Sequence, residues 1–164
     1  MIFRKIHDDR VFSPISGKFM TLEEVKDDAF SSGVMGPGFG IYPQSASVMS
    51  PFDGKVVMVF PTGHAIGLRR KDGLEVLIHI GIDTVNLQGK GFDILISMDE
   101  NVRKGQKLVD FDKELLAEMK LDPTVIFVFT NWEEYDIEIN NQAFISNKDV
   151  IAYAKKKVHH FSHH

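Results

Sequence analysis

The stretch HAIGLRRKDGLEVLIHIGIDTV, residues 64–85, contains two apolar runs separated by a turn sequence. Lys-Asp-Gly at positions 71–73 is typical of a β-hairpin turn, so strands at 64–69 and 74–80 should pair antiparallel. With a two-residue turn, Arg70 pairs with Gly73, and the same register places His64 opposite His79 on one face of the sheet. A slip of one residue would send the two imidazoles to opposite faces.

The rest of the chain favours an all-β fold. Turn residues recur about every ten residues across the 164 positions, and the segments between them are short and β-rich, which is typical of a sandwich or barrel. Short helical turns are expected at 21–25, 83–86 and 113–120, and Pro123 should end the last of them. The expected strands are 10–13, 17–20, 38–43, 46–50, 54–60, 64–69, 74–80, 93–96, 107–110, 124–130 and a final pair within 142–153.

One motif occurs twice. FSPISGK (12–18) and MSPFDGK (49–55) share the pattern Ser-Pro-x-x-Gly-Lys. Each reads as a proline-initiated turn that leads into a new strand, and we expect a positive φ at both glycines. The motif indicates a duplicated strand–turn–strand unit and carries no functional information by itself.

Composition narrows the class of protein. The length predicts a single domain over 1–164 with a sizeable core, and the apolar runs are too short to span a bilayer. The absence of cysteine excludes disulfides and thiolate chemistry and fits a cytoplasmic protein. A net charge of −4 argues against nucleic acid and favours a partner with a positive face.

The two histidines could carry chemistry. Either histidine alone is most simply a structural residue satisfied by one hydrogen bond, but two that meet beside Thr62 favour an active site. If the backbone fixes the proton of one ring on Nδ1, its Nε2 lone pair can accept a phosphoryl group while the other ring donates to the phosphoryl oxygens. Alternatively, His64 and His79 could hold zinc, with Asp83 or an external carboxylate as a further ligand.

Several motifs together resemble a known family. TGHAIGL, LIHIGIDTVNLQGKGF, SPISGK, DDAFSSGVMGPGFGIYP, MSPFDGK and VRKGQKLVDFD are similar to the glucose-family enzyme IIA of the bacterial phosphoenolpyruvate-dependent sugar phosphotransferase system. The resemblance covers about residues 11–131. It implies an antiparallel β-sandwich of the barrel–sandwich hybrid kind, here as a free-standing IIA domain.

The resemblance also implies a reaction. His79 matches the histidine that accepts the phosphoryl group from phospho-HPr, His64 the second active-site histidine, and Thr62 the hydroxyl bonded to it. Family members pass the phosphoryl group to a cysteine of a IIB domain of a glucose-type sugar permease. Because this chain has no cysteine, that acceptor must lie on another polypeptide, and no cofactor is required.

A docking surface follows from the same resemblance. Asp27 and Asp83 match acidic residues that meet an arginine of HPr. An apolar ring around the histidines is matched by Phe30, Val34, Met35, Phe60, Leu77 and Val85. The sequence departs from the family pattern at Asp28 and Ala29, which make the face more polar, and at Gly63, which replaces a frequent Asn.

Two other functions stay open. The first is a regulatory protein that binds other enzymes through the same face without phosphate flux. The second is a zinc peptidase, since His79-x-Gly-x-Asp83 also resembles the first ligand motif of lysostaphin-type endopeptidases. Residues 85–158 contain no histidine for the further ligand that those enzymes need. Residues 155–164 are expected to form a flexible basic, histidine-rich tail.

Overall fold

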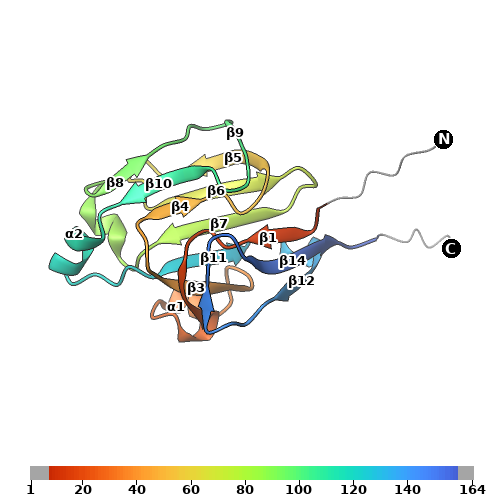
Figure 1. The fold of residues 1–164 in the computed structure, drawn as a ribbon, viewed down its shortest axis with the longest axis horizontal. Coiled ribbons are helices and arrows are strands. Elements are labelled where there is room, and N and C mark those ends of the chain that lie inside the picture. The colour runs from red at the N-terminus through yellow and green to blue at the C-terminus, as the bar shows by residue number, and fades with distance from the viewer. Residues whose placement is uncertain (1–7, 159–164) are drawn as a thin grey trace.

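The computed structural model describes residues 8–158, and it confirms the all-β prediction. Within these residues the strands form three antiparallel sheets that pack as a sandwich (Figure 1). The strands are β1 (Arg10–Phe12), β2 (Gly17–Thr21), β3 (Gly38–Pro43), β4 (Ser47–Met49), β5 (Gly54–Val59), β6 (Ala65–Arg70), β7 (Glu75–Ile80), β8 (Phe92–Ile94), β9 (Asn101–Val102), β10 (Lys107–Phe111), β11 (Val125–Phe129), β12 (Tyr135–Ile139), β13 (Phe144–Ile145) and β14 (Val150–Lys156).

The helical segments are short. They are the α-helices α1 (Asp28–Ser31) and α2 (Lys113–Glu118) and the 3-10 turns η1 (Leu22–Glu24), η2 (Thr84–Leu87) and η3 (Trp132–Glu134). The turns expected at 21–25, 83–86 and 113–120 are therefore confirmed, and α2 ends before Pro123 as expected. No helix in the described part of the chain is long and apolar enough to cross a membrane.

The largest sheet organises the molecule. Its strand order is β13-β2-β3-β11-β7-β6-β5-β9, and the two smaller sheets are β1-β14-β12 and β4-β10-β8. The central strand β11 is buried along its whole length and pairs with β3 and β7. Because β7 lies beside β11 and β6 lies beside β7, the hairpin that carries both histidines belongs to the centre of the sheet.

The two faces of β7 meet different cores. Val76, Ile78 and Ile80 point into the large core between the sheets. Leu77 points the other way, into a smaller cluster of Leu22, Val25, Phe30, Ala65, Ile82, Ile126 and Val128. By the two-residue period of a strand, His79 belongs to the face of Leu77. An imidazole is tolerated in this apolar strand because it lies on the thinly covered face and not in the main core.

Some elements were not predicted. The strands β9 and β12 and the helix α1 are absent from the expected set, and β9 spans only two residues. The predicted start of the flexible tail, at residue 155, is also wrong. Lys155 and Lys156 belong to β14 and pair with Asp136 and Tyr135. These lysines continue β14 because they pair with the edge strand β12, which was not predicted. The later part of the predicted tail, 159–164, lies outside the described residues.

The predicted hairpin register was wrong by one residue. His79 lies opposite Ala65, not His64, and the amide of Arg70 donates to the carbonyl of Leu74 at 2.8 Å. The loop therefore has three residues, with Gly73 at φ 103°. A left-handed glycine at the third position closes a three-residue loop, and this lengthened the turn by one residue.

The repeated motif is a structural duplication. Ser13 Oγ donates to the carbonyl of Ile15, and Ser50 Oγ donates to the carbonyl of Phe52, both at 2.7 Å. The predicted positive φ at the motif glycines is wrong. A Cβ at Gly17 or Gly54 would instead collide with the backbone carbonyl of a neighbouring strand. Glycine is needed there for close strand approach.

Candidate active site

His79 lies at the centre of the candidate site, near the end of β7. Its strand neighbours are Ala65 on β6 and Ile126 on β11. The ring of Phe30, from α1, packs against the imidazole with a centroid distance of 5.1 Å. These contacts leave the histidine half-buried, with an apolar floor below it and solvent above.

A hydrogen bond fixes the tautomer of His79. Its Nδ1 lies 2.8 Å from the carbonyl oxygen of Gly81, which can only accept, so Nδ1 carries the proton. Thr84 Oγ1 donates to the carbonyl of Ile80, and this bond holds the same turn. Nε2 is therefore left with its lone pair. Gly81 was not among the predicted site residues. The signal for it was a glycine directly after a buried strand, where it adopts φ 79°.

His64 reaches the same place by a different route. It precedes β6 and follows Gly63, which has φ 74°. Its carbonyl accepts from the amide of Ile80 at 2.7 Å. Its ring meets that of His79 edge to face, with the centroids 5.0 Å apart and the planes at 78°. The two rings meet despite the shifted register, because a residue in a turn does not follow the side-chain alternation of a strand.

Thr62 completes the pair. Its hydroxyl is hydrogen-bonded to Nδ1 of His64. The ring of Phe60 packs edge-on against His64 at 5.2 Å. The structure thus brings the three residues predicted to act together, Thr62, His64 and His79, into one contiguous chain of contacts.

Both imidazoles are shifted toward the neutral form. Burial lowers the pKa of His79, although the Gly81 carbonyl and the charges of Asp27 and Asp83 act in the opposite direction. Burial also lowers the pKa of His64, and the neighbouring His79 adds to that effect. A neutral imidazole keeps the lone pair that a nucleophile needs.

The two predicted acidic residues flank the site. The Asp27 carboxylate accepts from the amide of Ala29 at 3.0 Å and caps α1. Asp83 adopts φ 59° before η2, and its side chain makes no capping hydrogen bond. Asp27 is therefore partly engaged by its own helix, whereas the carboxylate of Asp83 is available to a partner.

The predicted apolar ring divides into exposed and buried members. Val34 is 79% exposed, Val85 50% and Phe60 36%. Met35 is half-buried, whereas Phe30 and Leu77 are buried in the small cluster. The exposed three can touch a partner directly, and the buried two shape the surface from beneath.

The metal question concerns the same two histidines. Among residues 8–158 there is no group of three or more His, Cys, Asp or Glu side chains that could hold a metal ion. A zinc ion at His64 and His79 would therefore need ligands from outside the described chain.

Fold and site together define a β-sandwich protein in which a half-buried histidine, with its proton fixed on Nδ1, contacts a second, buried histidine that is 3% exposed. The model of the phosphoenolpyruvate-dependent sugar phosphotransferase system family, EIIA 1, matches residues 9–135. The chain belongs to this family and is a component of the phosphotransferase system.

Relatives of known name agree with this assignment. The chain is 38% identical over 146 residues to the glucose-specific EIIA component of Mycoplasma capricolum, covering 89% of this chain and 95% of that protein. It is 44% identical over 129 residues to the glucoside-specific EIICBA component of Staphylococcus carnosus, covering 79% of this chain. The chain spans 19% of that relative, and 22% of the glucose-specific EIICBA component of the same organism.

A solved structure confirms the fold. The glucose permease IIA from Mycoplasma capricolum superimposes with a TM-score of 0.77 at 37% sequence identity. The match covers 87% of this chain and 93% of that structure.

Proposed function

We propose that the chain is a cytoplasmic phosphoryl carrier that takes a phosphoryl group from phospho-HPr onto Nε2 of His79. It then passes the group to a cysteine of a IIB domain of a glucose-type sugar permease. The observation that carries the proposal is the hydrogen bond from His79 Nδ1 to the Gly81 carbonyl. That bond leaves Nε2 as the nucleophilic nitrogen on the accessible side of a neutral ring.

The loading step needs positioning more than covalent machinery. The Nε2 lone pair attacks phosphorus as the bond between phosphorus and the donor breaks, so one bond replaces another with no net change in oxidation state. The proton on Nδ1 stays hydrogen-bonded to the Gly81 carbonyl oxygen, and this bond stabilises the positive charge that develops on the ring. In the unloading step, the sulfur of the IIB cysteine attacks phosphorus and forms the new bond as the bond between phosphorus and Nε2 breaks.

His64 serves the phosphoryl oxygens in this proposal. If the Thr62 hydroxyl donates to Nδ1 of His64, the proton of that ring resides on Nε2, and the ring can donate a hydrogen bond to the phosphoryl group. A preorganised donor at a position where negative charge arrives is among the stronger contributions a site can make. The edge-to-face contact of the two rings puts that donor next to the acceptor nitrogen.

The surroundings suit two successive protein partners. Asp83 and Asp27 present negative charge near His79, which would attract an arginine of HPr, and the chain has a net charge of −4. The exposed Val34, Val85 and Phe60 provide the apolar contact around it. Because His79 is the transfer point in both directions, HPr and IIB would use the same face in turn.

The test is phosphorylation by enzyme I, HPr and phosphoenolpyruvate. The wild-type chain should gain one acid-labile phosphate, and His79→Gln should gain none, because an amide has no nucleophilic lone pair. His64→Gln serves as the matched control, since it changes the neighbouring ring in the same way yet should still load. An unmodified wild-type chain, or a phosphate retained by His79→Gln, would refute the assignment.

A further inference from the structure

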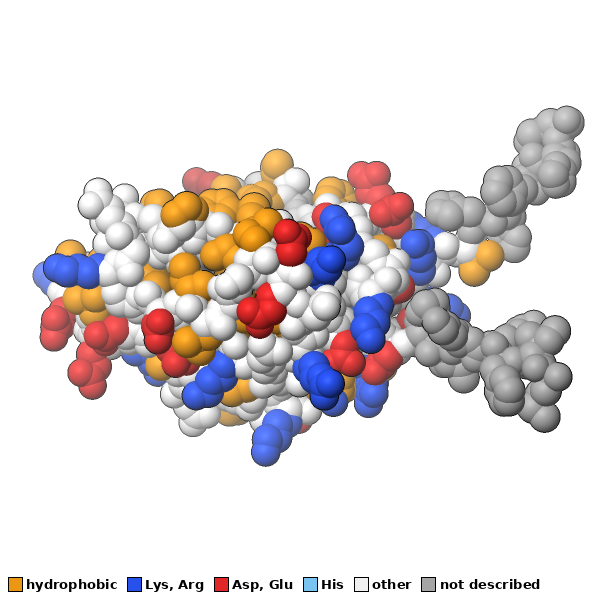
Figure 2. Space-filling model, turned by 90° about the horizontal axis from the view of Figure 1, so that it is seen from above, with side chains coloured by type: hydrophobic (Ala, Val, Ile, Leu, Met, Phe, Trp, Pro, Cys, Tyr) orange, Lys and Arg blue, Asp and Glu red, His pale blue; other side chains and the backbone are white. Residues whose placement is uncertain are grey.

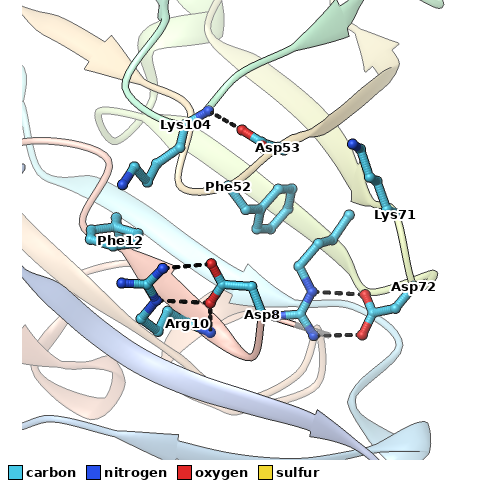
Figure 3. Close-up of a pocket in the computed structure, with 9 residues that line it drawn as sticks. Asp8, Arg10, Phe12, Phe52, Asp53, Lys71, Asp72 and Lys104 are labelled. Carbon is cyan, nitrogen blue, oxygen red and sulfur yellow. Dashed lines mark hydrogen bonds and ion pairs between the residues drawn. The ribbon is translucent and has the colours of Figure 1, made fainter. Parts of the chain in front are cut away.

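A cavity of about 410 Å³ lies at the other end of the β6–β7 hairpin, beside its three-residue loop. Its walls come from β1, the loop after β4, the hairpin loop and the loop after β9 (Figure 3). β6 is six residues long, about 20 Å at 3.3 Å per residue, and it separates this cavity from the histidine pair. None of the residues that line it belongs to the active site described above.

Cationic side chains line this cavity. Arg70 is 5% exposed and lines it, and its Nη1 has no hydrogen-bond partner among residues 8–158. Lys71 and Lys104 also line it, and the ammonium of neither forms an ion pair within the described residues, although that of Lys104 lies 4.2 Å from the centroid of the Phe12 ring. In Figure 3 the two lysine side chains lie on opposite sides of Phe52. Buried polar groups are rarely left unpaired in folded proteins, so Arg70 adds positive charge to the wall that the described residues do not fully satisfy.

The carboxylates of the same cavity are already engaged. Asp8 accepts from the side chain of Arg10, with two contacts of 2.8 Å. Asp72 accepts from Nε and Nη2 of Arg70, both at 2.7 Å. Asp53 accepts from the backbone amide of Lys104 at 2.8 Å. The cavity thus has spare donors, and each of its carboxylates already accepts a hydrogen bond.

The charged side chains around the cavity are also mostly basic. A neighbouring hollow shares Asp53, Arg70 and Lys71 with it and adds Lys55, Arg69 and Arg103. On the face drawn in Figure 2, most of the lysine and arginine side chains lie in the right half, and acidic side chains lie among them.

We propose that this cavity binds the phosphate group of a small soluble phosphate monoester. A phosphoryl group has three strong acceptor oxygens, which can accept hydrogen bonds from the ammonium groups of Lys71 and Lys104 beside the positive charge of Arg70. The buried Phe12 and Phe52 form the apolar part of the wall, against which the organic body of the ligand would pack. The volume is that of sites for small ligands. Because the cavity is remote from His79, such a ligand would bind while a protein covers the histidines.

The experiment is calorimetric titration of the full chain with glucose 6-phosphate as the probe monoester. Glucose is the uncharged match, inorganic phosphate lacks the organic body, and vesicles of phosphatidylglycerol test a lipid source of the phosphate group. We expect saturable binding of glucose 6-phosphate, weaker binding of inorganic phosphate, and none of glucose. Lys71→Gln and Lys104→Gln should each weaken binding about tenfold, as expected for the loss of one charge-assisted hydrogen bond.

Matched controls separate this site from others. Both test lysines are exposed, so their replacement should leave the fold intact, whereas Arg70 is part of a buried ion pair and is left unchanged. Lys18→Gln removes the same charge from an exposed position on β2 and should not change the affinity. His79→Gln should also bind normally, so the result is independent of the phosphoryl-carrier proposal. No binding of glucose 6-phosphate, equal binding by all lysine variants, loss in His79→Gln, or binding to vesicles alone would overturn the proposal.

Discussion

The two ends of the β6–β7 hairpin are built in opposite ways. At the loop end, Arg70 and Asp72 form an ion pair with both side chains 5% exposed, and Arg70 Nη2 also donates to the carbonyl of Ala154 at 2.6 Å. Tyr135 Oη donates to the carbonyl of Asp72 at 3.0 Å. At the histidine end, a few hydrogen bonds and a thin apolar cluster hold two rings near the surface. Buried charged contacts therefore hold the loop end of the hairpin, whereas the end that carries the histidines, where we propose that partners bind, is covered by the thin apolar cluster.

The largest effect is expected at the loop end of the hairpin, where loss of the Arg70–Asp72 ion pair should reduce stability. Asp72→Asn keeps the size of the side chain but leaves the buried guanidinium of Arg70 without its counter-charge, which should lower the free energy of unfolding by about 3–5 kcal/mol. Asp8→Asn is the matched control, because the Asp8–Arg10 pair has side chains 57% and 50% exposed. Its cost should be about 0–1 kcal/mol. Equal losses in urea denaturation would show that burial of the Arg70–Asp72 pair does not matter.

The Arg70–Asp72 pair also predicts how the stability of the protein depends on pH. Burial acts to raise the pKa of Asp72, but the hydrogen bonds and charge of Arg70 outweigh it, and the net shift is below the ordinary 3.8. A carboxyl with a depressed pKa in the folded state stabilises the protein above its unfolded pKa and loses that effect as pH falls through the folded value. The stability difference between wild type and Asp72→Asn should therefore persist at pH 5 and narrow only below about pH 3.8.

The next largest effect is expected on phosphoryl transfer at the histidine end of the hairpin. His64→Gln should load phosphate on His79 but unload to the IIB cysteine more slowly by a factor of about 10²–10³, the usual cost of one preorganised donor. Rapid-quench measurement of the two half-reactions separates the steps. Wild-type unloading would remove His64 from the transfer step, and failure to load would mean that the two histidines have exchanged roles.

A smaller effect is expected at Thr62. Thr62→Val removes the hydroxyl that bonds to His64 Nδ1 and should slow unloading about tenfold, in line with one net hydrogen bond. Thr62→Ser keeps the hydroxyl and should restore most of the rate. If serine and valine behave alike, the methyl group matters and the hydrogen bond does not.

The smallest effect is a shift in the titration of His79. Burial lowers its pKa below the ordinary 6.5, while Asp27 and Asp83 raise it. The ring should therefore stay neutral, and competent to accept phosphate, down to pH values below 6.5. Asp83→Asn and Asp27→Asn should move the midpoint lower still, as followed by nuclear magnetic resonance of the ring. An unchanged midpoint in either variant would mean that the carboxylate does not act on His79.

Much of the fold could be predicted because its signals are local. Most strands between 38 and 130 follow from short β-rich runs bounded by turn residues, and the helical turn before Pro123 follows from chain sterics. The strands β9 and β12 could not be predicted in the same way. β9 has two residues and pairs with β5, which lies far away along the chain, and β12 pairs with β14 across the intervening strand β13. Such pairing depends on long-range contacts that no local window contains.

The sequence by itself determined the composition of the site. Thr62, His64, His79 and Asp83 stand in two short motifs whose residue types allow phosphoryl transfer or zinc binding, and the resemblance to the enzyme IIA family favours the first. Only the tertiary structure decided how they meet. A three-residue loop displaced the ladder by one residue, and the turn at Gly63 turned His64 back toward His79. The reason is that backbone dihedrals at two glycines set the relative placement of the rings, and glycine allows several values of φ that only the folded neighbours select.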